Sequence, residues 1–530
     1  MNDISWIWLI AIPVISSPLV YLIGRIVSRY ILAGSPVHIT GEGAIALGKT
    51  PRQPLKANQN NPARWVGLVV LLIAWIPLIQ VWQRLIANGT LNYQYGAINL
   101  HLDGISLLMA AVILSLGTLA SLFSGAYLRE DEGQEKFYAL LNIMIGSMIG
   151  LVCAADLFNL WVWFELMAIA SYMLVAFYST QRASLEAGVK YLVQSVTGSI
   201  LVLLGIALVF SQTGALGFDQ IQAKVSAGGA SAQLLLAAGA LFMIGFGVKV
   251  ALVPLHTWLP DAHSQAPSGI SAMLSGVVIE TGLIALLRAV GAIASVSNHW
   301  GGILLAFGAV NMLVGNLMAL RQTQVKRLLA YSSLSHIGYI LLGLGTAIAF
   351  NSPEAAQGGF FHIITHAMMK GLAFLAVGSL LYALYVAKGQ HGPLTTSDLA
   401  GAAKRYPWPA LCLSIAVLGL GGLPPLAGFM SKWQIFTAGF KTQNGWIIGL
   451  VIFAALNSVL SLGYYAPLVN LMYRGEASPV VKAGNNIPVS MLIPLILLAI
   501  GIIILGFSPT LVNGLTGPAG ISLITTFGIK

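Results

Sequence analysis

Residues 245–260, GFGVKVALVPLHTWLP, place a lysine, a histidine and two prolines inside a long apolar run. Lys249 stands about one helical turn before Pro254. A lysine at membrane depth costs about 2.5–3.5 kcal/mol on insertion scales. Pro254 breaks or kinks a helix, because it lacks a backbone N–H and clashes with the preceding turn. A buried cation beside a helix break is typical of an ion pathway.

The composition excludes a soluble catalytic domain. Of the 530 residues 57% are hydrophobic and 8% are charged, whereas soluble domains carry about 25% charged residues. Cys153 and Cys412 both lie in apolar runs, which suits neither a disulfide framework nor an iron–sulfur or zinc site. The chain also lacks a G-x-G-x-x-G loop. We therefore expect an all-α polytopic membrane protein that binds no cofactor and no metal itself.

Apolar runs of about 20 residues predict the membrane-spanning helices. We expect fourteen, near residues 5–25, 64–87, 104–127, 137–154, 157–178, 190–211, 233–253, 269–291, 302–320, 328–350, 357–385, 408–440, 446–472 and 488–508. The 408–440 run contains GGLPP at residues 421–425, so it is predicted to be a broken helix.

The basic residues predict the orientation. With the N-terminus outside, the predicted cytoplasmic segments hold 18 of the 26 lysines and arginines and the outer segments hold 5. The remaining 3 are Lys249, Lys370 and Lys432, inside the membrane. Because cytoplasmic loops of membrane proteins are enriched in basic residues, the net charge of +10 reflects topology and not nucleic-acid binding.

Four segments between or after the spans carry specific expectations. The polar insertion 28–63 is predicted to be a cytoplasmic loop. Residues 88–103 alternate polar and apolar side chains, which predicts an outer hairpin, and Asp103 is expected to cap the next helix. Residues 213–232 are expected to form an outer loop and 509–530 a short tail.

Two ionisable residues in the first half are candidates for proton movement. Glu165 lies in the middle of LFNLWVWFELMAIASYML, where an isolated carboxylate is strongly disfavoured, so it is expected to be protonated or paired with a cation. A structural ion pair between helices is the alternative. Glu280, in SAMLSGVVIETGLIALL, is predicted either to pair with Lys249 or to carry the proton onward.

Histidines and a lysine form a stripe in the second half. His362, His366 and Lys370 are spaced i, i+4, i+8, so they share one helix face. Histidine titrates between about pH 5 and 8, which suits a proton relay, as does His336 among three serines. Zinc binding is disfavoured, because no HExxH glutamate accompanies the pair. Histidines bonded to backbone carbonyls remain the structural alternative.

Lys432 follows the break at GGLPP by a few residues, as a second buried lysine beside a broken helix. Two such segments in two halves indicate an internal repeat, and five helices per unit invert the second unit. We expect helices 1–3 in residues 1–136, one repeat in 137–294, a second in 302–472, and a final helix and tail in 473–530. His256, Asp261 and His263 form either a proton entrance or a hydrogen-bonded loop.

Four motifs resemble the proton-pumping family that includes the antiporter-like subunits of respiratory complex I and the Mrp-type cation/proton antiporters. They are GVKVALVPLHTWLPDAHSQAPSGISAMLSG, QTQVKRLLAYSSLSHIGYILLG, FFHIITHAMMKGLAFL and GLPPLAGFMSKW. The resemblance implies two inverted five-helix units, 4–8 and 9–13, with broken helices 7 and 12.

The resemblance also implies roles for the buried residues. Glu165 and Lys249 become a coupling pair, Lys432 the terminal carrier, and His336, His362, His366 and Lys370 members of a hydrophilic axis. Most relatives carry lysine or histidine in the eighth helix where this chain has Glu280.

The resemblance further implies a proton-translocating subunit of a complex I-like NAD(P)H- or ferredoxin:quinone oxidoreductase. Its partners are other membrane subunits and its setting is a prokaryotic cell membrane or a thylakoid membrane. A subunit of a Mrp-type Na⁺/H⁺ antiporter is the alternative reading.

Overall fold

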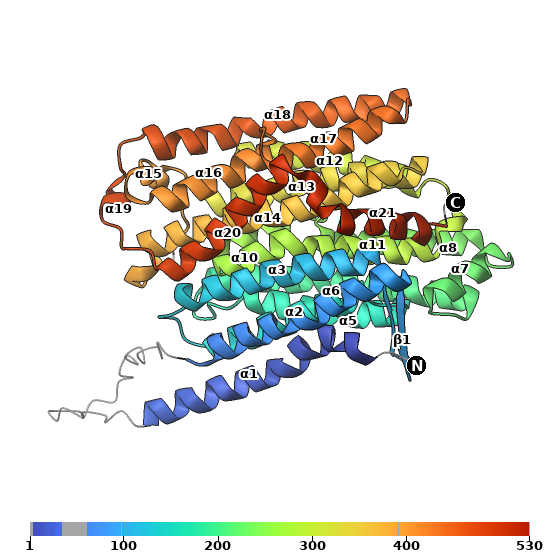
Figure 1. Cartoon of the computed structure of the whole chain (residues 1–530), viewed down its shortest axis with the longest axis horizontal. Coiled ribbons are helices and arrows are strands. Elements are labelled where there is room, and N and C mark those ends of the chain that lie inside the picture. The colour runs from blue at the N-terminus through green and yellow to red at the C-terminus, as the bar shows by residue number, and fades with distance from the viewer. Residues whose placement is uncertain (1–3, 34–60, 97, 391, 529–530) are drawn as a thin grey trace.

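The computed structural model describes residues 4–33, 61–96, 98–390 and 392–528. Long helices lie roughly side by side, with α1 along one flank and α18 along the other (Figure 1). The predicted cytoplasmic insertion begins inside α1, which runs to Ala33, and its residues 34–60 lie outside the described residues.

Thirteen helical segments in the described ranges are long and apolar enough to cross a membrane. They are α1 (Trp8–Ala33), α2 (Ala63–Asn88), α3 (Gly104–Tyr127), α4 (Gln134–Val152), α5 (Leu157–Val175), α6 (Arg182–Thr213), α8 (Ala232–Val250), the continuous segment of α10 (Ser268–Met273), η2 (Leu274–Val278) and α11 (Ile279–Ala292), then α12 (Trp300–Leu320), α13 (Val325–Phe350), α14 (Pro353–Leu384), α18 (Gly445–Arg474) and α20 (Val489–Phe507). A helix suits this setting because it satisfies its own backbone polar groups without water.

The two predicted helix breaks are confirmed. The run 408–440 is divided into α16 (Pro407–Gly421) and α17 (Ala427–Lys441), with Gly422 at a positive φ of 82° that suits glycine. The first break follows α8, and the chain resumes as α9 (Trp258–Gln265). With α16 and α17 counted as one broken span, the fourteen predicted spans are all present and the all-α polytopic fold is confirmed.

The remaining elements are short. They are η1 (Ile4–Ile7), β1 (Leu91–Tyr95), β2 (Ile98–Leu102), α7 (Phe218–Ser226), η3 (Ala294–Val296), η4 (Val386–Lys388), η5 (Ser397–Leu399), α15 (Ala402–Arg405), α19 (Pro479–Lys482), η6 (Pro509–Val512) and α21 (Asn513–Thr526). The antiparallel pair of β1 and β2 confirms the predicted hairpin. The prediction that 213–232 is only a loop is partly wrong, because α7 forms within it.

The short tail predicted at residues 509–530 contains a helix that was not predicted, because residues 513–526 form α21. This helix packs closely on the start of α3, where a side chain at Gly104 would collide with the backbone of Pro518. The N–H of Gly104 donates to the Ser522 hydroxyl over 3.1 Å. The tertiary contact therefore stabilises a helix that its own glycine- and proline-containing sequence favours weakly.

Asp103 caps α3 as predicted, since its carboxylate accepts from the N–H of Ser106 over 2.8 Å. It also forms a 2.9 Å ion pair with Arg288 of α11, and each side chain is 5% exposed. Burial raises the pKa of Asp103, but Arg288 and the Ser106 N–H outweigh it and the net pKa is lowered. Arg288 therefore forms a buried ion pair that connects α11 to the start of α3.

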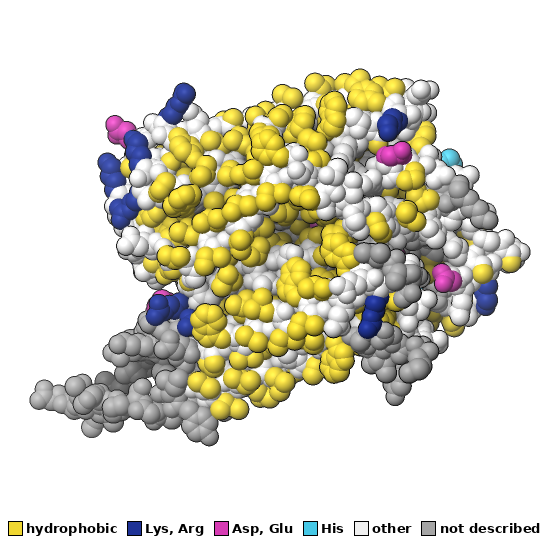
Figure 2. Space-filling model, viewed as in Figure 1, with side chains coloured by type: hydrophobic (Ala, Val, Ile, Leu, Met, Phe, Trp, Pro, Cys, Tyr) yellow, Lys and Arg dark blue, Asp and Glu magenta, His cyan; other side chains and the backbone are white. Residues whose placement is uncertain are grey.

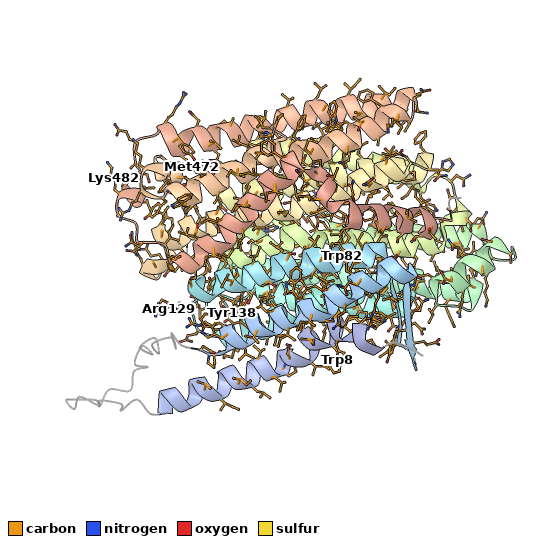
Figure 3. All side chains as sticks on the ribbon, in the orientation of Figure 1. Trp8, Trp82, Arg129, Tyr138, Met472 and Lys482 are labelled. Carbon is orange, nitrogen blue, oxygen red and sulfur yellow. The ribbon has the colours of Figure 1, made fainter. Side chains whose placement is uncertain are left out.

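The surface separates an apolar middle from charged ends. In Figure 2 hydrophobic side chains cover the middle of the visible face, and Lys and Arg gather at the end where α15 and α19 lie. Arg129 and Lys482 lie toward that end in Figure 3, whereas Trp82 lies nearer the hairpin. The apolar band has the character of a bilayer-facing surface.

Helix α14 occupies the centre of the bundle. It contacts α3, α10, α13, α16, α17, α20 and α21. The neighbouring segment Ser268–Ala292 is buried throughout. The fold thus brings the polar residues of α11, α13, α14 and α17 into the interior.

Candidate functional site

The interior of the bundle contains the predicted stripe of α14. His362, His366 and Lys370 are each fully buried. Since they recur every four residues, they point along one side of the helix. Their partners come from the helices that pack against that side.

Glu280 of α11 meets His366. Its Oε1 lies 2.5 Å from the His366 Nδ1, and neither side chain is exposed. The alternative that Glu280 pairs with Lys249 is therefore wrong for this structure. Glu280 follows the π-helical turn η2, a local irregularity that is frequent at functional sites.

Two further histidines extend this contact toward α17. The His336 Nδ1 lies 3.1 Å from the His362 Nε2, and the His362 Nδ1 lies 2.8 Å from the Ser431 hydroxyl. The His336 ring also stacks on the His366 ring with centroids 5.2 Å apart. The structural alternative, in which backbone carbonyls satisfy the histidines, is wrong because their partners are side chains.

Lys370 lies at the other end of the stripe. Its ammonium group donates to the Ser332 hydroxyl and, over 2.8 Å, to the Leu329 carbonyl of α13. A buried lysine needs such acceptors, because desolvation without them is costly. Lys370 is thus held on α13.

Lys432 uses the break between α16 and α17. Its Nζ donates to the Leu420 carbonyl and to the Ser458 hydroxyl, each over 2.8 Å. Leu420 lies in the last turn of α16, where carbonyls have no partner within the helix. The Nζ also lies 4.5 Å from the centre of the Tyr339 ring, a cation–π arrangement.

Lys249 has a similar environment at the end of α8. Its Nζ donates to Ser171 over 3.1 Å and to Tyr191 over 2.6 Å, and lies 4.7 Å from the centre of the Tyr191 ring. Glu165 is not among its hydrogen-bond partners, and the buried Glu165 Oε1 forms no hydrogen bond with a described residue. The implied Glu165–Lys249 pair is therefore not in direct contact here.

The residues after the first break form a helix with charged partners. Asp261 of α9 makes ion pairs with Lys190 of α6 at 3.1 Å and with Arg327 of α13 at 2.6 Å. His263 is fully buried and stacks on Phe374 with centroids 4.6 Å apart. Asp261 thus connects α9 to α6 and to α13. These contacts are compatible with a proton entrance and with a purely structural segment.

Sequence reasoning missed the hydroxyl partners of the buried cations and histidines. Ser171, Tyr191, Ser431 and Ser458 lie in apolar runs, where a lone hydroxyl has no distinctive pattern. Ser431 had one signal, since it directly precedes Lys432 in the chain.

These observations define the class of protein. In the ranges of the chain that the structure describes, no group of three or more His, Cys, Asp and Glu side chains is arranged to hold a metal ion. The site is instead a buried row of carboxyl, imidazole, hydroxyl and ammonium groups in a polytopic helical bundle. Such groups exchange protons, and ionisable residues inside membranes mark ion and proton pathways.

Comparison with known families agrees with this class. Residues 154–458 match the family model described as NADH:quinone oxidoreductase/Mrp antiporter, TM, and residues 93–138 match NADH-Ubiquinone oxidoreductase (complex I), chain 5 N-terminus. The first match spans more than half of the chain. The protein therefore belongs to the family of antiporter-like, proton-translocating membrane subunits.

Individual relatives cover most of the chain. F(420)H(2) dehydrogenase subunit N of Methanosarcina mazei is 33% identical over 79% of this chain and 84% of its own length. NADH-quinone oxidoreductase subunit N 2 of Roseiflexus castenholzii is 34% identical over 78% and 82%.

Solved structures share the whole fold. A chain of the archaeal membrane-bound sulfane sulfur reductase is 28% identical, with a TM-score of 0.81 over 98% of both chains. A chain of the Mrp complex from Dietzia sp. DQ12-45-1b has a TM-score of 0.81 at 21% identity over 100% of this chain and 99% of its own. The latter likeness concerns the fold alone.

Proposed function

We propose that this protein is the proton-translocating membrane subunit of a complex I-like oxidoreductase that takes electrons from NAD(P)H or ferredoxin and passes them to quinone. Partner subunits perform the redox chemistry, and the protein itself binds no redox cofactor. The observation that carries the proposal is the buried row from Glu280 through His366, His336 and His362 to Ser431.

The proposed proton path uses eight residues in two halves. A charge change in a neighbouring subunit alters the interaction of Glu165 with Lys249. A proton then passes along the row of buried polar residues to Lys432. The residues are Glu165, Lys249, Glu280, His336, His362, His366, Lys370 and Lys432.

We also propose that the chain contains two related units, 137–294 and 302–472, between an N-terminal region of residues 1–136 and a C-terminal region of residues 473–530. Each unit contains five spans, the fourth of which is broken. Each also contains a buried lysine that donates to a serine and lies over a tyrosine ring. These shared features support the repeat.

The proposed setting is a prokaryotic cell membrane or a thylakoid membrane, with the N-terminus outside. The hairpin, α7 and α21 lie toward one end of the bundle in Figure 1, and Lys and Arg gather at the other in Figure 2. Since basic residues favour the cytoplasmic side, this distribution supports the orientation. The partners are other membrane subunits of the assembly.

The alternative is a subunit of a Mrp-type Na⁺/H⁺ antiporter, which the fold match to the Mrp chain supports. The two relatives compared above are named as dehydrogenase and oxidoreductase subunits, which favours the first reading. Purification in mild detergent distinguishes them. Redox subunits copurify in the first case, and only small antiporter subunits in the second.

The central test uses the complex reconstituted into vesicles. Lys249→Ala is expected to leave substrate oxidation in place and to abolish most proton translocation, because the charge is removed beside the break. Lys388→Ala removes an exposed lysine at the end of η4 and serves as the control. Full translocation by the Lys249→Ala complex contradicts the proposal.

A further inference from the structure

Three polar atoms meet at the end of α8. The Lys249 Nζ donates to the Ser171 and Tyr191 oxygens, and those two oxygens lie 2.9 Å apart. Lys249 is 1% exposed and Tyr191 is fully buried. The ammonium group is therefore bound by two hydroxyl oxygens and not by the carboxyl group of Glu165, which lies on the same helix as Ser171.

The hydrogen bonds of this group are mutually consistent. The Ser171 hydroxyl donates to the Ala168 carbonyl over 2.8 Å, so its oxygen is free to accept from Lys249 and from Tyr191. The Tyr191 hydroxyl then donates to Ser171 and accepts from Lys249. Two oxygens thus accept from one ammonium group, an arrangement that stabilises its charge.

Tyr191 is fixed in place by the residues around the helix break. Its ring stacks flat on Trp258 of α9, with centroids 3.9 Å apart and planes 3° apart. The Trp258 indole N–H donates over 2.7 Å to the Val248 carbonyl in the last turn of α8. Trp258 is therefore anchored to a carbonyl in the last turn of α8, and its ring in turn orients the tyrosine that accepts a hydrogen bond from Lys249.

Glu165 is a competing partner for the same cation. It lies six residues before Ser171 on α5, about 9 Å along the helix axis, and the ring centre of its neighbour Phe164 lies 5.9 Å from the Lys249 Nζ. Lysine has a flexible four-carbon stem, so its ammonium group can move between two nearby sites.

We infer that Ser171 and Tyr191 form a dock for the Lys249 ammonium group that competes with Glu165, and that Lys249 exchanges between the dock and Glu165 during proton translocation. The structure shows the docked arrangement. In it Lys249 donates to the two hydroxyl oxygens, and the Glu165 Oε1 forms no hydrogen bond with a described residue. Ser171 and Tyr191 are positioning residues. The inference rests on the proposed function.

The test is Tyr191→Phe, measured as protons translocated per substrate oxidised in the reconstituted complex. Phenylalanine keeps the stack on Trp258 and removes only the hydroxyl. Loss of one hydrogen bond to a charged group is expected to lower translocation by about tenfold. Tyr172→Phe is the matched control, because Tyr172 contacts the Tyr191 ring edge-on and makes no hydrogen bond to Lys249. Ser171→Ala removes the longer of the two hydrogen bonds to Lys249 and is expected to lower translocation by about threefold. It is the substitute test if the complex with Tyr191→Phe does not assemble.

Competition is tested in the Glu165→Gln background. Without the rival carboxylate, adding Tyr191→Phe is expected to change translocation less than about twofold, since coupled sites are not additive. A merely structural role for Tyr191 predicts the same factor in both backgrounds, and that result overturns the inference. So does normal translocation by both Tyr191→Phe and Ser171→Ala. Full translocation by Lys249→Ala instead overturns the proposed function itself.

Discussion

The Oε1 of Glu280 lies 2.5 Å from the Nδ1 of His366, and this contact joins α11 to α14 across the two proposed units. The resemblance of the motifs implies a lysine or histidine in the eighth helix, where this chain has Glu280. At this position the carboxyl group of Glu280 instead lies against the imidazole of His366. The link between the units is therefore a short acid–base pair with both side chains fully buried.

Glu280→Gln is expected to separate proton transfer from packing. Glutamine has nearly the same shape and keeps a hydrogen bond to His366, but an amide does not exchange a proton as a carboxyl group does. Translocation by the reconstituted complex is expected to fall by at least about tenfold with substrate oxidation retained, within the usual range for loss of an acid–base group.

A charge exchange provides the control for that variant. Glu280→Lys alone places a cation against an imidazole, and His366→Glu alone places two carboxyl groups together. The double variant restores an opposite pair, so it is expected to translocate more than either single variant. Equal translocation by all three, or unchanged translocation by Glu280→Gln, is incompatible with a role for this contact.

Ser431→Ala is expected to interrupt the row between His362 and α17. The serine hydroxyl lies 2.8 Å from the His362 Nδ1 and receives a hydrogen bond from Thr365. Its loss leaves a buried ring nitrogen without that partner, which costs about 1–3 kcal/mol. Translocation should fall several-fold, as measured by the initial rate of vesicle acidification.

Ser379→Ala is the matched control for Ser431→Ala. Ser379 is also fully buried, but its hydroxyl bonds only to the Ala376 carbonyl of its own helix. This variant is expected to translocate at the wild-type rate. If both serine variants lose activity equally, the loss reflects packing and not the histidine contact.

Local chemistry accounts for what the sequence could predict. Apolar runs of spanning length predicted all fourteen spans, and proline placed both breaks, because each effect acts within one segment. The hairpin followed from alternation, and Asp103 followed from the N-cap preference for a short side chain that accepts a hydrogen bond.

Contacts between distant segments account for what was missed. The partner of Glu280 is 86 residues away on another helix, and no pattern within either helix selects it. Tyr191 and Ser171 became functional candidates only once α5, α6 and α8 were side by side. Helix α21 was missed because a contact with Gly104 stabilises it more than its own composition does.

The Asp103–Arg288 pair makes a prediction about stability and pH. The pKa of Asp103 is lowered in the folded protein from its ordinary value of 3.8. The ionised carboxylate therefore stabilises the folded state at pH values above 3.8. This contribution is lost as the pH falls through the lower pKa of the folded protein. In detergent, the melting temperature of the wild type is expected to decrease below about pH 4.

Asp103→Asn isolates that contribution. Asparagine is also a good N-cap, so the start of α3 is kept while Arg288 loses its charged partner. Breaking a buried pair in this way costs about 3–5 kcal/mol, so the variant should melt at a lower temperature at neutral pH and show a flatter profile on acidification. A wild-type melting temperature for Asp103→Asn excludes the pair as a stabilising contact.

Gly282→Ala is expected to displace Lys249 without changing any polar group. A Cβ at this position of α11 would lie 3.0 Å from the Lys249 Cγ and 3.2 Å from its Cβ, so the lysine stem has to move. Overpacking of this kind costs about 1–3 kcal/mol, and the ammonium group shifts relative to Tyr191 and Ser171.

Gly449→Ala is the matched control, since a Cβ there meets no atom within 4 Å and alanine favours a helix. Gly282→Ala should lower translocation several-fold and Gly449→Ala should not; equal rates for the two variants mean that translocation does not depend on the placement of Lys249.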